Sequence, residues 1–127
     1  MQKFIVTSAI KNYPDKLPYE AIKNSILGAR YDLSLSFVGA TRAKTLNQTY
    51  RQKDYAPNVL SFPLTESTGE IYICPAVTKS EAKKFNLSPD GYIAFLFIHG
   101  CLHLKGHDHS DAMDKLESKY LKLFKIS

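Results

Sequence analysis

The chain has 127 residues and a mass of 14.3 kDa, enough for one globular domain with a buried core but not for two. Hydrophobic residues make up 44% and charged residues 23% of the sequence, a balance that excludes a globally disordered chain. The formal charge is +5 and the pI is about 9.2, which favours a polyanionic partner. No apolar run approaches the ~20 residues of a membrane span.

Nothing in the sequence suggests export. The apolar stretch near the N-terminus is too short for a typical signal peptide, and no small-residue cleavage site follows it. We therefore expect Cys74 and Cys101 to be reduced thiols without a disulfide, and the protein to be cytoplasmic.

Nine elements are expected in chain order. They are a strand at 3–10, a helix at 18–29, a strand at 33–38, a helix at 41–53, strands at 58–64 and 69–74, and helices at 79–85, 88–106 and 110–125. Helical spacing turns three sets of residues inward: Ile22, Ile26 and Ala29; Ala43, Leu46 and Tyr50; and Met113, Leu116, Tyr120 and Phe124.

Local signals fix several element ends. Thr41 is expected to cap the helix at 41–53, and Ser88 to cap a helix with Pro89 at its first position. Gly106 is expected to close that helix. Because Pro63 cannot donate to a ladder, its strand is expected at a sheet edge. The order of elements predicts one α+β domain over 1–127, with a small mixed sheet packed with helices.

All four histidines lie in the stretch HGCLHLKGHDH, residues 99–109. The preceding YIAFLFI, residues 92–98, is apolar on every side of a helix, which predicts a helix buried at the domain centre. His99 and His103 lie four residues apart and stack on one face of that helix. Two unpartnered imidazoles in a core are costly, and one metal ion would satisfy both. The alternative is an exposed histidine-rich turn with adventitious metal affinity.

The third ligand depends on where the helix ends. If it continued, His107 would stand about 12 Å along the axis from His99, too far to share an ion. Gly106 allows a left-handed turn that folds the chain back, so that His109 completes the site. Three imidazoles and an open fourth position are typical of a catalytic zinc site, although nickel, copper or iron suit the same ligands.

Two neighbours of these histidines have more ordinary interpretations. Asp108 is expected either to orient a ligand imidazole or to cap the last helix. Cys101 lies about 200° around the helix from His99 and is expected in the core.

The histidine spacing also matches H-E-x-x-H-x-x-G-x-x-H, the zinc motif of the metzincin peptidases. Gly100 stands where those enzymes have the glutamate that acts as general base. Because glycine cannot take a proton, we expect the metalloprotease scaffold without the peptidase mechanism.

The sequence His-Gly-x-Leu-His-Leu-x-Gly-x-Asp-His resembles the signature of the YbeY family, bacterial rRNA maturation factors regarded as zinc-dependent endoribonucleases. The resemblance extends upstream to LNQTYRQKD, NVLSFP, GEIYI and EA, at residues 46–54, 58–63, 69–73 and 81–82. The sequence departs from the family pattern at Glu70, where Asp is more usual, and at His107, where an aromatic residue is common. The chain is also short for the family.

The resemblance implies a compact fold of metalloprotease-like architecture around one Zn²⁺, with His99, His103 and His109 as ligands. It implies an endoribonuclease specific for single strands, acting in maturation of the 16S rRNA 3′ end and in ribosome quality control. Its partners would be ribosomal RNA and the ribosome or ribosome-associated proteins, with no membrane contact. Arg51 matches a family arginine near the metal that is thought to contact RNA phosphate.

Basic residues around Arg51 are consistent with an RNA substrate. Residues 42–53 contain four basic residues and no acid, and Lys44 and Arg51 share one polar stripe. Such a stripe is more often a solvated helix face. If the substrate is RNA, however, the interpretation that Arg51, Lys44 and Lys53 bind its phosphates is favoured. Arg51 would also neutralise charge in the transition state.

The proton carrier is left open between Asp108, Asp54 and zinc-activated water itself. Lys115, Lys119 and Lys122 form another basic line on the last helix, which is expected to face solvent. Two other functions remain: a metallopeptidase with a relocated general base, and a ribosome-associated RNA-binding module with structural zinc. Chelator-sensitive proteolysis would favour the first, and RNA binding without metal-dependent turnover the second.

Overall fold

A computed structural model describes residues 4–127 and contains one four-stranded sheet. The strands are β1 (Phe4–Ser8), β2 (Asp32–Phe37), β3 (Val59–Thr65) and β4 (Thr68–Ile73), in the spatial order β1-β2-β4-β3. β1, β2 and β4 are parallel, whereas β3 runs antiparallel to β4. The mixed sheet and the edge position of the strand that contains Pro63 are confirmed. Lys3, in the first expected strand, lies outside the described residues.

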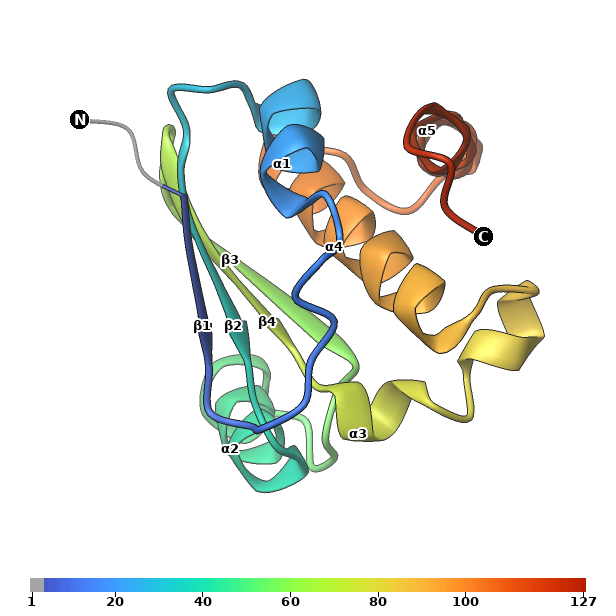
Figure 1. Cartoon of the computed structure of the whole chain (residues 1–127). Helices are drawn as coiled ribbons and strands as arrows, with labels where there is room; N and C mark the ends of the chain where they lie inside the picture. Colours follow the sequence, from blue (N-terminus) through green and yellow to red (C-terminus); the bar gives the residue numbers. More distant parts are fainter. Residues whose placement is uncertain (1–3) are drawn as a thin grey trace.

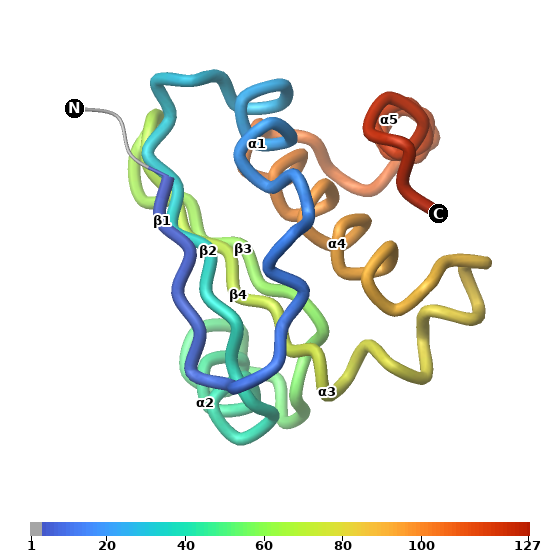
Figure 2. The backbone as a smooth tube through the Cα atoms, in the orientation of Figure 1, coloured from blue at the N-terminus to red at the C-terminus, as the bar shows by residue number. Residues whose placement is uncertain are grey.

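Helices cover the sheet mainly from one side (Figure 1). They are α1 (Tyr19–Leu27), α2 (Ala40–Arg51), α3 (Pro75–Thr78), the 3-10 turn η1 (Ala82–Phe85), α4 (Pro89–Lys105) and α5 (Asp111–Leu123). α4 contacts α1, α5, β3 and β4, and therefore lies at the centre of the domain. Figure 2 shows α3 and η1 leading from the end of β4 to the beginning of α4. The expected single α+β domain is confirmed.

Strand alternation explains how the core forms. Leu33, Leu35 and Phe37 point to the buried side of β2, while the residues between them are only half-buried. These side chains join Ile71 and Ile73 of β4 and the apolar residues of α4 in one cluster. Because α4 is apolar on every side, it can pack against the sheet, α1 and α5 at once.

The ends of α4 form as the sequence predicted. The Ser88 hydroxyl accepts a hydrogen bond from the backbone N–H of Gly91 at 3.0 Å, and Pro89 occupies the first turn. Gly106 ends the helix with φ 110°, a left-handed conformation that glycine adopts without steric cost.

Three expectations about where helices begin and end are wrong. α1 ends at Leu27, so Ala29 lies beyond the helix and is exposed. α2 is capped at Gly39 without a side-chain hydrogen bond, and Thr41 lies inside the helix. No α-helix covers residues 79–85 as expected: α3 ends at Thr78, and this range contains only the 3-10 turn η1.

Tyr50 is also not turned inward: it is 61% exposed and packs edge-on against Phe62 with ring centroids 5.4 Å apart. Asn47 takes the inward position at this end of α2, and its side-chain amide donates to the carbonyl of Tyr55 at 3.0 Å. A polar side chain can occupy this buried position because the carbonyl of Tyr55, in the loop after α2, accepts its hydrogen bond.

The inward face of α5 is as expected: Met113 is buried, and Leu116, Tyr120 and Phe124 pack against the core. Cys74 and Cys101 are both buried and free. Within residues 4–127, no helix is long and apolar enough to cross a membrane.

Candidate metal centre

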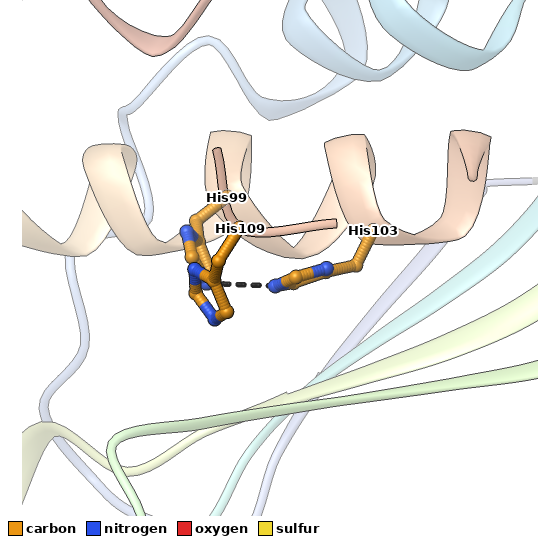
Figure 3. Close-up of side chains that lie close together, drawn as sticks. All are labelled: His99, His103 and His109. Atoms are coloured by element: carbon orange, nitrogen blue, oxygen red, sulfur yellow. Dashed lines mark hydrogen bonds between the residues drawn. The ribbon is translucent and has the colours of Figure 1, made fainter. Parts of the chain in front are cut away.

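Three histidines converge beside α4 (Figure 3). His99 and His103 project from one face of α4, and His109 comes from the segment that leads to α5. One ring nitrogen of each lies within 4.8 Å of the other two. The ring centroids are 4.4 to 5.0 Å apart, so the rings surround one common point.

The turn after α4 brings His109 to this point. The backbone N–H groups of Gly106 and His107 donate to the carbonyls of His103 and Leu102, both at 3.0 Å, which closes the helix. The chain then runs back toward α5 (Figure 2). His107 stays outside the group of three rings, as the sequence predicted from the turn.

Hydrogen bonds behind the rings fix which nitrogen carries the proton. His99 Nδ1 lies 2.6 Å from Glu117 Oε2, and His103 Nδ1 lies 2.9 Å from the carbonyl oxygen of His107. A carboxylate and a carbonyl only accept, so both Nδ1 atoms carry hydrogen, and in the neutral form of each ring Nε2 presents a lone pair. The two Nε2 atoms are 2.9 Å apart. Facing lone pairs repel, and a shared cation removes that repulsion.

This arrangement fits a metal ion. Burial and the neighbouring His99 lower the pKa of His103, which favours the neutral imidazole that binds metals. Acceptors on the far nitrogens are the usual support of histidine ligands, since they orient the ring and raise its basicity. Burial raises the pKa of Cys101, which stays a protonated core thiol.

Glu117 is the residue that the sequence analysis missed. It lies on α5, is only 7% exposed, and shares a helix column with Met113, four residues earlier. The sequence did contain a signal for this role, namely an acidic residue on the inward face of α5. A buried carboxylate requires a hydrogen-bonding or charged partner, so its position predicts one.

Asp108 takes neither of its two expected positions. Ser110 caps α5 by accepting from the N–H of Met113 at 3.2 Å. Glu117 and the His107 carbonyl hold the two α4 imidazoles, while Asp108 is exposed. Its side chain lies on the wall of the cleft that contains the histidines.

That cleft has a volume of about 1040 Å³ and is lined by the three histidines together with Arg51, Lys53 and Asp108. Residues from α2 and from the end of α4 therefore meet in one space. Lys44 and Asp54 lie outside the cleft lining and form an ion pair at 3.6 Å. Asp54 also accepts from Gln48 at 2.5 Å, so its carboxylate is directed at α2.

Hydrogen bonds connect Arg51 to α4 through Ser61 of β3. Its Nη2 donates to the carbonyl of Ser61 at 2.7 Å, and the Ser61 hydroxyl donates to the carbonyl of Gly100 at 3.2 Å. The guanidinium also lies 5.3 Å from the centroid of the Phe62 ring. A guanidinium has five N–H donors, so donors remain after the bond to Ser61.

Gly100 has no space for the glutamate of the metzincin motif. A Cβ at this position would lie 2.9 Å from Ser61 Oγ and 3.0 Å from Ile71 Cδ1. A side chain at this position would therefore force the side chains of Ser61 in β3 and Ile71 in β4 to move. Close packing of α4 on the sheet thus accompanies the absence of the general base at this position.

Comparison with known proteins is consistent with this geometry. The family model of Endoribonuclease YbeY matches residues 2–125. The chain belongs to the YbeY family. The chain is 40% identical to the Endoribonuclease YbeY of Cupriavidus metallidurans over 103 residues, which cover 77% of this chain and 52% of that protein. The corresponding protein of Neisseria gonorrhoeae is 37% identical over 122 residues, covering 86% of this chain and 70% of its own length.

The chain thus spans between about half and about 70% of the length of these YbeY relatives. A solved structure shares the fold. The solution structure of TM1509 from Thermotoga maritima superposes with a TM-score of 0.69 at 28% identity, covering 94% of this chain and 87% of that one.

Proposed function

We propose that this chain is a zinc-dependent endoribonuclease that cleaves single-stranded regions of RNA. The observation that carries the proposal is the group of His99, His103 and His109, each with one ring nitrogen within 4.8 Å of the other two, in a cleft that is also lined by Arg51. Membership of a family named for endoribonucleases supports RNA as the substrate. Maturation of the 16S rRNA 3′ end and ribosome quality control, in the cytoplasm and with ribosomal partners, are the proposed setting.

The three histidines would hold one zinc ion. When bound, zinc acts as a Lewis acid on a phosphoryl oxygen and lowers the pKa of water toward ~7. Glu117 and the His107 carbonyl keep the α4 imidazoles in the tautomer that presents Nε2. Arg51, fixed by its bond to Ser61, would use its remaining N–H groups to bind the phosphate and stabilise its developing charge.

Three further residues, Lys53, Lys44 and Asp108, have secondary roles in this proposal. Lys53 on the cleft wall would add a positive charge near the backbone of the RNA. Lys44 would reach phosphate only outside the cleft, after leaving its ion pair with Asp54. Asp108 is the proposed proton carrier, because its carboxylate is exposed on the cleft wall beside His109.

The test compares metal-quantified wild-type protein with a variant in which His99, His103 and His109 are all alanine. Structured rRNA with single-stranded segments should be cut by the wild type, protected by EDTA and cut again after Zn²⁺ is restored. The triple variant should fold, as judged by circular dichroism, but neither bind zinc nor cut. Lys119→Ala, on the exposed line of α5, is the matched control and should cut normally.

The same preparation separates the two alternatives. Unfolded casein-like protein, incubated in parallel, should remain intact, because Gly100 supplies no base. Chelator-sensitive proteolysis without RNA cleavage would establish a metallopeptidase. RNA binding by zinc-loaded protein with no turnover would establish a binding module with structural zinc.

A further inference from the structure

A cluster of aromatic rings extends along the cleft from the metal centre. Tyr92 and Phe95 of α4 are stacked, with centroids 5.8 Å apart and an interplanar angle of 15°. Phe85, from η1, stacks on Tyr92 at 5.1 Å and lies 5.4 Å from Phe95. Phe95 in turn lies 6.3 Å from the His99 ring. All three aromatic residues line the same cleft as the histidines.

Phe85 is the exposed end of this cluster. It remains 50% exposed, although a phenylalanine of a folded domain is usually buried. Water therefore contacts an apolar ring surface inside a cleft that carries Arg51 and Lys53 on its wall. An exposed aromatic ring in a cleft that also carries cationic side chains is a combination with which proteins bind single-stranded nucleic acid.

The ring beneath Phe85 is held in place. The Tyr92 hydroxyl donates to Glu81 Oε1 at 3.2 Å, and the side-chain amide of Asn58 donates to the same oxygen at 3.2 Å. Tyr92 itself is only 2% exposed. Phe85 therefore packs against a side chain that is already held in place. Binding of a stacking partner would then cost little conformational entropy of the protein.

We propose that Phe85 is a stacking platform for one nucleobase of a single-stranded RNA substrate. Because the Phe95 ring lies 5.4 Å from that of Phe85 and 6.3 Å from that of His99, the stacked base would belong to a nucleotide next to the scissile phosphate or to the following one. Both faces of a base are covered in a duplex, so the platform accepts only an unpaired, unstacked nucleotide. The inference rests on the proposed function, and names the subsite that makes that activity selective for single strands.

Lysines beside Phe85 suit the backbone of the same RNA. Lys83 and Lys84 immediately precede Phe85 in η1 and are both exposed. A phosphate next to the stacked base would therefore meet positive charge beside Phe85, in addition to the charge that Arg51 supplies on the cleft wall. An apolar peptide segment would gain nothing from these charges.

The first test measures binding of metal-loaded protein to a single-stranded 2′-O-methyl oligoribonucleotide, chosen to slow cleavage during the measurement. Phe85→Leu keeps an apolar side chain of similar size but removes the ring, and should weaken binding roughly 5- to 150-fold. Phe85→Trp should bind at least as tightly as the wild type. Tyr50→Leu removes another exposed ring, which does not line the cleft, and should leave the Kd unchanged.

The second test asks whether the lost interaction is with a base. An abasic nucleotide is moved along the oligonucleotide, and one position should weaken wild-type binding as much as Phe85→Leu does. With that abasic oligonucleotide, Phe85→Leu should cause no further loss. A 2-aminopurine at the same position should be quenched by wild-type protein and much less by Phe85→Leu.

Several results would overturn the platform. Unchanged affinity in Phe85→Leu would do so, as would an equal loss for normal and abasic oligonucleotides at every position. If wild-type protein cuts RNA while either result holds, the proposed function survives and only the platform fails. If wild-type protein neither binds nor cuts RNA, both proposals fall together.

Discussion

Glu117 allows a quantitative test of the metal centre. Its carboxylate lies 2.6 Å from His99 Nδ1, and its side chain is only 9% exposed, so little solvent screens the interaction. Replacing an acceptor of this kind typically lowers metal affinity 10- to 100-fold, or about 1.4–2.7 kcal/mol. Glu117→Gln keeps an acceptor oxygen but loses the charge, and should lie near the tenfold end. Glu117→Ala loses both and should approach 100-fold.

The assay is a competition for Zn²⁺ between the protein and a chromophoric chelator at fixed pH. Asp114→Asn is the matched control, because Asp114 is an exposed carboxylate on the same helix and the same cleft wall. This variant removes one negative charge but leaves the hydrogen bonds to the histidine rings in place. It should therefore change zinc affinity less than threefold. Wild-type affinity in Glu117→Ala would refute the reasoning. An equal loss in Asp114→Asn would show that overall charge, not the bond to His99, sets the affinity.

Three further predictions concern the histidines, Arg51 and Gly100. His109→Ala should lose most of its zinc by metal analysis while His107→Ala retains it, and the reverse order would contradict the assignment of the third ligand. Arg51→Ala should keep its zinc but cut RNA roughly 30- to 1000-fold more slowly, a loss of ~2–4 kcal/mol. Arg51→Lys should recover only part of this rate, and a wild-type rate in Arg51→Ala would exclude a direct phosphate role. Gly100→Ala should lower the free energy of unfolding by about 1–3 kcal/mol, because the added methyl group has no space against β3 and β4; an unchanged denaturation midpoint would be inconsistent with that packing.

Features that depend on neighbouring residues were readable from the sequence. The apolar pattern of α4 predicted its central position, and its ends followed from Ser88 and Gly106. The turn at Gly106 selected His109 over His107, because helix geometry and a glycine at positive φ determine positions only a few residues away. The alternation in β2 and the proline in β3 likewise predicted one buried sheet face and one edge.

Contacts between helices and strands that are far apart in the sequence could be determined only from the tertiary structure. Glu117 reaches His99 because α5 packs against α4, and nothing local to either helix specifies which acid meets which ring. The sequence pointed to Asp108 for these roles because it is adjacent to His109 in the chain. In the structure, Ser110 caps α5 and Glu117 binds the imidazole of His99. Phe85 joins the cleft through stacking on Tyr92. Periodicity and capping are encoded in adjacent residues, whereas these contacts arise from packing between residues distant in the sequence, which only the folded chain brings together.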